Sequence, residues 1–243
     1  LLLTGSGRID RSSQLTVEFC AFMVNERKMK KENIILATDN LGNNITISQL
    51  QNWINTESKI ELADFFYHRF YGRYIKPYDF KNSEYIKKYK NGFAIMTSCC
   101  LLIETFVSFT DPFFLDTNQK SERCFGYFFL TQEEFIEFSK GGLKESDYRN
   151  SNRKKLNNKG ISNDFYKNVR CGILHNGEVK NNWRIVRNGV LFDTKNKVIN
   201  SHLFLQKLKD VMKKFKFNLK NSNIEDEIWK TYLLRLESLI KNS

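Results

Sequence analysis

This chain of 243 residues contains few of the residues that interrupt regular structure. It has only two prolines, Pro77 and Pro112, and 12 glycines. Because proline and glycine are the usual signals for turns, their scarcity argues against an all-β fold with many short strands and favours long helices. We therefore predict a mainly α-helical protein.

The sequence also lacks the patterns of several well-defined sites. Its five cysteines form no C-x-x-C pair, and Cys99 and Cys100 are adjacent within an apolar run. Such cysteines are typical of small core residues in a reducing, cytoplasmic setting rather than of disulfides or zinc sites. No H-E-x-x-H, G-x-S-x-G, Walker loop or acidic metal-binding cluster is present. We therefore expect neither a metal nor a cofactor.

No segment of the sequence is expected to target or cross a membrane. Leu1–Leu3 is too short for the hydrophobic region of a signal peptide. The longest apolar run, Phe93–Phe109, is shorter than a membrane span and contains polar residues, Glu104 among them. We expect this run to form a buried core helix.

Aromatic side chains and positive charge are abundant. The chain has 21 Phe, 10 Tyr and 3 Trp, which predicts a core rich in aromatic contacts. Its formal net charge of +12 is compatible with a polyanionic partner, most simply nucleic acid. The same charge is compatible with an evenly solvated surface in a lysine- and asparagine-rich protein.

Apolar periodicity predicts helices along most of the chain after residue 46. The first expected helix begins near Ser48, which would cap it, and a second spans 57–74 and ends before Pro77. A third spans 92–109, and a fourth spans 131–139 and begins with a capping box at Thr131–Glu134. The next begins at Ser162 and ends at Asn176–Gly177, and the last two span 202–219 and 224–240.

Two regions have the shorter period of β-strands. Apolar residues on both sides of Arg187–Gly189, with the Asn-Gly dipeptide, predict a small β-hairpin near 183–200. Near the N-terminus, Leu15–Val24 and Asn33–Ala37 fit two short strands or a helix followed by a strand. We treat residues 1–46 as an N-terminal α/β extension or the end of a preceding domain, and 47–243 as one helical domain.

Basic residues are candidates for RNA contact. Those we select are Arg153 and Lys154 in the polar loop before the 162–176 helix, and Lys207, Lys213 and Lys214 on the 202–219 helix. In the 57–74 helix, by contrast, we favour a partly exposed amphipathic face for His68, Arg69 and Arg73 over RNA contact.

The most informative segment is Asn168–Gly177, at the end of the 162–176 helix. Arg170 has a permanent charge and a fork of donors that suits phosphate oxygens. His175 can take and give a proton near neutral pH. Five ideal helical steps turn the chain by about 500° and advance it by about 7.5 Å, so the two side chains do not share one stripe. They converge only if the arginine reaches along the axis or the helix end loosens.

The Arg170-x-x-x-x-His175 motif, late in a helix that follows the apolar helix containing Ile103–Phe106, resembles the HEPN superfamily. Val169–Gly177 is especially similar to the active-site segment of such proteins, and the resemblance covers about residues 47–240. It implies a HEPN-like helical bundle. Many members are metal-independent ribonucleases of toxin, phage-defence and CRISPR-associated systems, and members commonly build a composite site from two copies.

Two departures from the family pattern affect what the resemblance implies. The position after the arginine is often polar in active members, whereas Cys171 stands here. No tyrosine closely follows His175, so the neutralisation of some toxin members by AMPylation is not supported.

From this resemblance and the residue chemistry we expect a metal-independent endoribonuclease that acts as a homodimer. Arg170 and His175 are the expected catalytic residues, with Glu104, Asn176 and Cys171 in support. A carboxylate in an apolar helix is costly unless paired, and Arg170 is an attractive partner for Glu104; a local donor at the helix edge is the alternative. We expect the protein to act as a toxin or as an effector of antiviral defence by abortive infection. We also expect a regulatory or antitoxin protein to restrain its nuclease activity.

The competing hypothesis is a catalytically inactive HEPN-like module that binds RNA, a nucleotide or a partner protein. Cys171 is the residue that favours this alternative.

Overall fold

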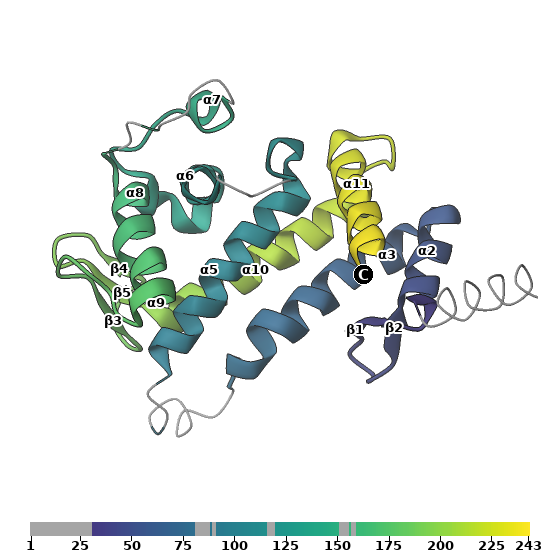
Figure 1. The fold of residues 1–243 in the computed structure, drawn as a ribbon, viewed down its shortest axis with the longest axis horizontal. Helices are drawn as coiled ribbons and strands as arrows, with labels where there is room; N and C mark the ends of the chain where they lie inside the picture. Colours follow the sequence, from purple (N-terminus) through teal and green to yellow (C-terminus); the bar gives the residue numbers. More distant parts are fainter. Residues whose placement is uncertain (1–30, 81–87, 89–90, 116–119, 151–155, 157–158) are drawn as a thin grey trace, which may run out of the picture.

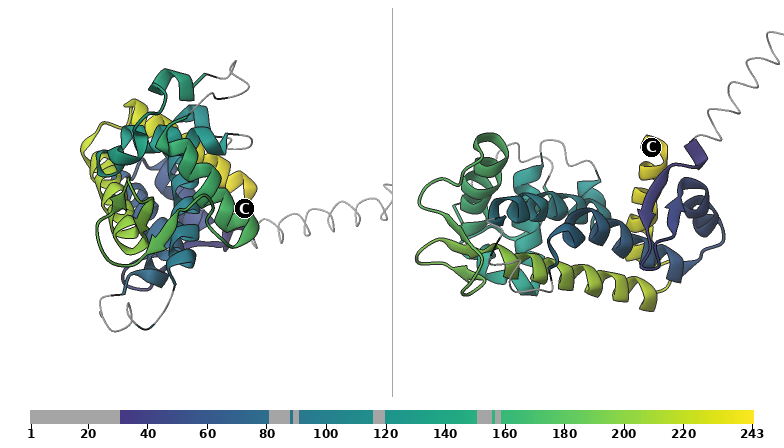
Figure 2. Two further views of the ribbon diagram at one scale, coloured as in Figure 1. Left: turned by 90° about the vertical axis from the view of Figure 1, so that its left-hand side faces the viewer. Right: turned by 90° about the horizontal axis from the view of Figure 1, so that it is seen from below.

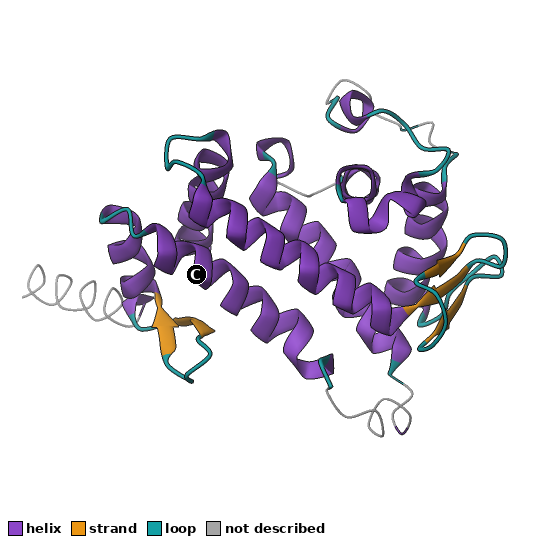
Figure 3. Ribbon diagram, turned by 180° about the vertical axis from the view of Figure 1, so that it is seen from behind, coloured by secondary structure: helices purple, strands orange, loops and turns teal. Residues whose placement is uncertain are grey.

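The computed structural model describes residues 31–80, 88, 91–115, 120–150, 156 and 159–243 (Figure 1). This part of the chain is mainly helical and contains a two-stranded and a three-stranded sheet. Figures 2 and 3 show the two sheets at opposite ends of the helical body. The prediction of a mainly α fold with small β elements is confirmed.

Helices make up the body of the protein. The α-helices are α2 (Ile47–Asn55), α3 (Lys59–Phe70), α5 (Gly92–Thr110), α6 (Ser121–Thr131), α7 (Glu145–Tyr148), α8 (Ile161–Phe165), α9 (Cys171–Asn176), α10 (Ser201–Asn221) and α11 (Glu227–Asn242). Two π-helical turns span Tyr71–Ile75 and Tyr166–Arg170, and 3₁₀ helices span Lys76–Tyr78, Pro112–Phe114 and Glu133–Ser139. The strands are β1 (Ile35–Thr38), β2 (Asn44–Thr46), β3 (Arg184–Val186), β4 (Phe192–Asp193) and β5 (Val198–Asn200).

Helix α5 is central to the body, with α10 packed along it, α3 packed on α10, and α11 on α5 (Figures 1 and 2). Aromatic rings fill the space between these helices. The ring centroid of Phe66 lies 4.7 Å from that of Phe215 and 6.0 Å from that of Tyr232. Cys99 and Cys100 are buried free thiols on α5, as predicted. Among the described helices, α5 alone is long and apolar enough to cross a membrane, but 61% of its apolar stretch is buried inside the protein. The prediction of a core helix is confirmed.

A second group of aromatic side chains lies under the helix that contains the Arg170–His175 motif. Phe165 of α8 stacks on Phe204 of α10 at 5.9 Å and contacts Phe129 of α6 edge-on at 5.1 Å. Helix α6 was not predicted from the sequence. Because α8 is anchored on both α6 and α10, the motif helix has a fixed position on the body.

A β-hairpin is present near 183–200, as predicted, and is formed by β4 and β5, but its turn is not at Asn188–Gly189. The strand order is β3-β5-β4, in which β3 runs parallel to β5 and β4 runs antiparallel to it. The residues on either side of Asn188–Gly189 therefore do not pair with each other, and the hairpin turn is at 194–197 instead. Asn200 explains the difference: its side chain donates to the Gly189 carbonyl at 2.9 Å and its N–H donates to Leu191 O at 3.0 Å.

The predicted capping box at Thr131–Glu134 does not form. Thr131 is the last residue of α6, and its hydroxyl donates to Tyr127 O at 2.9 Å instead of accepting from the next helix. The 131–139 segment consequently continues as the 3₁₀ helix Glu133–Ser139. Helix boundaries shift elsewhere as well: Thr46, not Ser48, caps α2, and α11 begins at Glu227 behind Asp226.

Part of the predicted N-terminal extension belongs to the same core as the helices. Strands β1 and β2 form an antiparallel pair, and Leu36 and Ile45 are buried in the common hydrophobic core. Leu15–Val24 lies outside the described residues.

The β1–β2 pair also corrects one expectation for α3: Arg69 is only 7% exposed, and its Nη1 donates to the Leu36 carbonyl at 2.5 Å. The strand covers a helix face that was expected to be partly open.

Candidate functional site: the Arg170–His175 helix

The motif lies on one continuous helix built from three segments. The N-cap of helix α8 is Gly160, two residues earlier than the predicted cap Ser162. The π-helical turn Tyr166–Arg170 follows and leads directly into α9. Isolated π-helical turns within α-helices are rare and are often found at functional sites. Arg170 is the last residue of this wide turn, and His175 is in the last turn of α9.

The helix ends as predicted at Asn176–Gly177. Gly177 adopts the left-handed conformation with φ 71°, which glycine adopts without steric cost, and its N–H donates to Ile173 O at 3.0 Å. The chain then folds back over the helix, because the Glu178 N–H donates to Gly172 O at 3.3 Å. A Cβ on Gly172 would lie 2.4 Å from the Glu178 carbonyl oxygen. Only glycine fits at position 172 without moving the backbone of the chain that folds back over the helix.

Replacing Gly172 with alanine should destabilise the protein by at least about 1 kcal/mol, because the backbone must move to accommodate the methyl group. Urea unfolding measures this loss. Gly72 is a matched control, since a Cβ there meets no atom within 4 Å. Gly72→Ala should leave the stability unchanged or raise it. Equal stabilities of the two variants would contradict the close approach at Gly172.

Arg170 and His175 project from different sides of the helix, because five helical steps separate their directions by about 140° around the axis. His175 and Asn176 are exposed, whereas Arg170, Cys171 and Leu174 are half-buried. Arg170 and Leu174 form one i, i+4 row, and Cys171 and His175 form the next. No hydrogen bond or other described contact joins the Arg170 and His175 side chains, and α9 remains helical to Asn176, so one copy of the helix does not bring the two predicted catalytic residues together. No hydrogen bond to a described residue holds the His175 imidazole.

Arg170 is held by an ion pair with Glu104 of α5. Its Nε and Nη2 both lie 2.9 Å from Glu104 Oε1, and both side chains are 15% exposed. The pairing expected from the apolar context of Glu104 is therefore present, and the alternative of a local donor is not needed. The contact joins residues 66 positions apart in the sequence. Nη1 of Arg170 does not take part in the ion pair. It lies on the side of the guanidinium away from the carboxylate, 4.0 Å from Cys171 Sγ.

Tyr166 completes the surroundings of Arg170. The guanidinium carbon lies 5.5 Å from the centroid of its ring, a cation–π contact. The pKa of Tyr166 is raised to about 12, mainly because the phenol is buried and secondly because Cys171 is close to it. Burial by itself lowers the pKa of Arg170. The charge of Glu104, with smaller contributions from Tyr166 and Cys171, raises the pKa by more than burial lowers it, so the net shift is upward. Arg170 is therefore a fixed cation, and Tyr166 is a protonated phenol.

A polar network fixes the same helix to the three-stranded sheet. Asp164 accepts from Trp183 Nε1 at 3.2 Å and pairs with Lys197 at 2.8 Å. Asn168, which is buried, donates to Asp164 at 2.6 Å and accepts from Asn181 at 2.8 Å. These positioning residues were not identified from the sequence; the only signal was the placement of polar side chains on the inner face of an otherwise apolar helix.

The candidate RNA-binding lysines do not form a free basic stripe. Lys213 and Lys214 are exposed, but they pair with Asp210 at 3.8 Å and Glu133 at 3.1 Å. Lys207 is exposed and has no ion-pair partner among the described residues. Arg153 and Lys154 lie outside the described residues. The other lysines of α10 are also paired: Lys209 with Asp79, and Lys216 and Lys220 with Asp64. Much of the positive charge of α10 is thus locally neutralised.

Comparisons of this chain with protein-family models, curated proteins and solved structures gave no match. Within the described residues, no group of three His, Cys, Asp or Glu side chains is placed to hold a metal ion. Function is therefore inferred from the geometry of the motif helix and from the chemistry of its side chains.

Proposed function

We propose that this protein is a metal-independent endoribonuclease of the HEPN type, with Arg170 and His175 as its catalytic residues. The observation that carries the proposal is the Glu104–Arg170 ion pair. It holds a permanently charged guanidinium five residues before an exposed imidazole on the same helix. A cation that binds phosphate beside a group that transfers protons is the minimum equipment for cleaving a phosphodiester without metal.

The chemistry requires two proton transfers. One group removes the proton of the 2′-hydroxyl as its oxygen attacks the phosphorus, and another protonates the departing 5′-oxygen. Arg170 would stabilise the charge that develops on the non-bridging oxygens. The C-terminal end of a helix, where His175 lies, favours a nearby positive charge, typically by under about 1 kcal/mol at exposed sites. The products would be a 2′,3′-cyclic phosphate and a 5′-hydroxyl.

A single copy of the site has only one proton-transfer group, since His175 has no second histidine beside it among the described residues. We propose that a symmetric homodimer forms through the exposed end of α9, around His175 and Asn176, and places two copies of His175 in one cleft. Leu174, which is half-buried next to His175, would supply an apolar contact for this interface. One imidazole would act as the base while the other acts as the acid.

A second candidate function is a non-catalytic module that binds RNA or a partner protein. The specific observation in its favour is that Glu104 already occupies two donors of Arg170, with Cys171 beside the remaining edge. In this alternative the ion pair only fastens the motif helix to α5.

The test is to incubate the purified protein with total RNA in EDTA. The enzyme proposal expects cleavage that persists in EDTA and leaves 2′,3′-cyclic phosphate ends, which end-labelling and mass spectrometry detect. Cleavage only after addition of a divalent metal would contradict the proposed mechanism. Inactivity on every RNA, combined with retained RNA binding, would favour the non-catalytic module.

We further propose a cytoplasmic role in defence against phage, as a toxin restrained by a partner protein. The free thiols at Cys99, Cys100, Cys124 and Cys171 fit a reducing compartment. A nuclease without restraint would harm its host, so this role requires an inhibitor or a trigger.

A further inference from the structure

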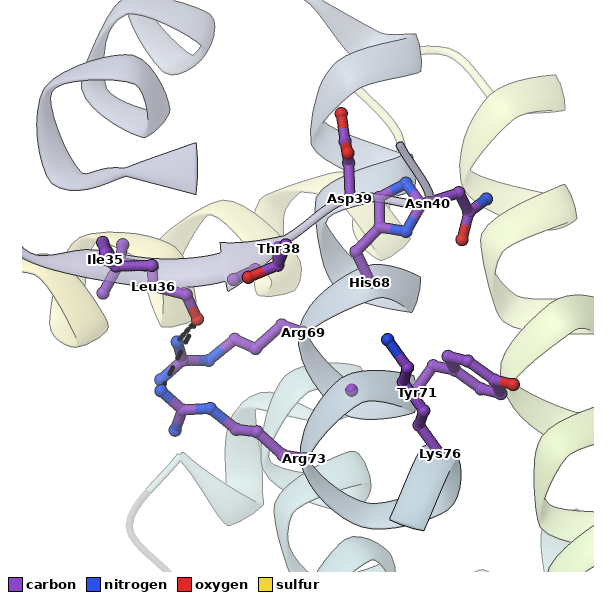
Figure 4. Close-up of a pocket in the computed structure, with 12 residues that line it drawn as sticks. Ile35, Leu36, Thr38, Asp39, Asn40, His68, Arg69, Tyr71, Arg73 and Lys76 are labelled. Atoms are coloured by element: carbon purple, nitrogen blue, oxygen red, sulfur yellow. Dashed lines mark hydrogen bonds between the residues drawn. The ribbon is translucent and has the colours of Figure 1, made fainter. Parts of the chain in front are cut away.

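A basic cavity lies at the other end of the protein from the motif helix. It has a volume of about 530 Å³ and is lined by β1, the end of α3 and the π-helical turn Tyr71–Ile75 (Figure 4). Figure 1 shows β1 and α9 at opposite ends of the body. This cavity is therefore separate from the Arg170–His175 face, and a ligand bound in it would not require the proposed nuclease activity.

Two arginines from successive turns form one wall of the cavity. Arg69, which is more than nine-tenths buried, donates from Nη1 to the Leu36 carbonyl at 2.5 Å. Arg73 directs its Nη2 to the same oxygen at 3.5 Å. Figure 4 shows the two guanidiniums side by side at this carbonyl. One neutral acceptor is thus shared between two cations.

No described carboxylate forms an ion pair with either arginine. Asp39 lines the cavity, but it accepts hydrogen bonds from Leu41, Asn43 and the Asn43 side chain within its own turn. Figure 4 shows its carboxylate directed away from the arginines. Lys76 and His68 also line the cavity and add no negative charge. The cavity therefore has an excess of positive charge.

This arrangement is unfavourable for the protein without an anion. Like charges at i and i+4 of a helix destabilise it, and a buried cation is costly unless it is paired. Burial, followed by the neighbouring Arg73, lowers the pKa of Arg69 to about 10, yet it remains charged at neutral pH. A bound anion would relieve both the repulsion and the lack of a partner.

We propose that this cavity binds the phosphate of a small phosphomonoester, such as a nucleoside monophosphate. A terminal phosphate has close to two negative charges at neutral pH and three outward oxygens, which suit the donors of the two guanidiniums, and Lys76 adds a further positive charge to the lining of the cavity. The volume is within the range of cavities that hold small ligands. An RNA backbone phosphate has one charge and two attached sugars, so it is a poorer fit for a wall formed by a nearly buried arginine.

Isothermal titration calorimetry of the whole protein with AMP, adenosine and inorganic phosphate tests this proposal. We expect AMP and phosphate to bind and adenosine not to bind. Arg73→Gln should weaken AMP binding at least about tenfold, because a charged hydrogen bond is lost. Lys76→Gln should weaken it less. Lys195→Gln removes the same charge from the exposed turn between β4 and β5, at the other end of the protein, and should have no effect.

The controls separate folding from binding. Arg69 is avoided because its loss would affect the core. Circular dichroism establishes that each variant is folded, and AMP should raise the melting temperature of the wild type more than that of Arg73→Gln. Equal binding of AMP by the wild type, Arg73→Gln and Lys76→Gln would overturn the proposal, as would absence of phosphate binding. A 5′-hydroxyl RNA oligomer that displaced AMP at equal concentration would show that the site binds nucleic-acid backbone instead.

Discussion

Replacing His175 with alanine should lower RNA cleavage at least about a hundredfold, the usual loss when a general acid or base is removed. The fold should not change, because the side chain is exposed and no described residue holds its imidazole. RNA affinity should be nearly unchanged, since Arg170 and the lysines remain. Initial rates on a defined RNA, together with fluorescence anisotropy for binding, measure the two effects separately.

His202 offers a matched control for this prediction. It is half-buried at the start of α10, and the charged groups that act on it are Asp79 and Arg187 rather than Arg170 or Glu104, so His202→Asn should cleave at the wild-type rate. Mixed dimers test the composite site further. If both copies of His175 act in one cleft, activity should fall with the square of the wild-type fraction as His175→Ala protein is exchanged in. A linear fall would mean that each copy acts alone, and normal cleavage by His175→Ala would rule out the proposed mechanism.

Breaking the Glu104–Arg170 ion pair should cost about 2 kcal/mol of unfolding free energy, somewhat less than removal of one partner from a fully buried pair. Glu104→Gln leaves a largely buried guanidinium without its counter-charge. Cleavage should also fall at least about tenfold, because Arg170 is no longer held in one orientation and orientation contributes strongly to rate. Arg170→Lys should lower activity by a similar factor while RNA binding survives, since the charge remains but the fork of donors is lost.

Urea unfolding of Glu104→Gln, Arg170→Gln and the double variant gives the coupling energy of the pair. We expect a coupling of about 1 to 2 kcal/mol. Glu133→Gln is the control, because the Glu133–Lys214 pair is exposed and should contribute under about 1 kcal/mol. Zero coupling would mean that the contact does not fix Arg170. Lost stability with unchanged cleavage would show that the ion pair only fastens the motif helix to α5 and does not position Arg170 for catalysis.

Local periodicity was sufficient to predict the long helices. The apolar run of α5 and the i, i+4 pattern of α10 were recognised because each helix buries a continuous face. The Asn-Gly signal failed because Asn200, from outside the dipeptide, binds the loop that contains Gly189. The capping-box signal failed because Thr131 ends the preceding helix α6, which was not predicted, and its hydroxyl donates within that helix. In both cases the segment next to the short motif decided the outcome.

The Glu104–Arg170 pairing was predictable from the sequence, but the geometry around it was not. A carboxylate in an apolar helix requires a partner, and Arg170 of the motif was the expected one. No local pattern indicated the π-helical turn or the position of Tyr166 beside the guanidinium. Arg69 was misjudged for a related reason: its helix has a typical amphipathic pattern, and only the fold shows that β1 covers that face.

The π-helical turn Tyr166–Arg170 makes the length of this helix as important as its composition. Each residue added to or removed from a helix turns everything beyond it by about 100°. The π-helical turn already holds one residue more than an α-helical turn, so a further residue inserted between Phe165 and Arg170 would leave every motif residue present, yet it would rotate His175 and take Gly172 away from the returning chain. Insertions in this stretch should therefore be tolerated far less than substitutions of exposed residues such as Lys167.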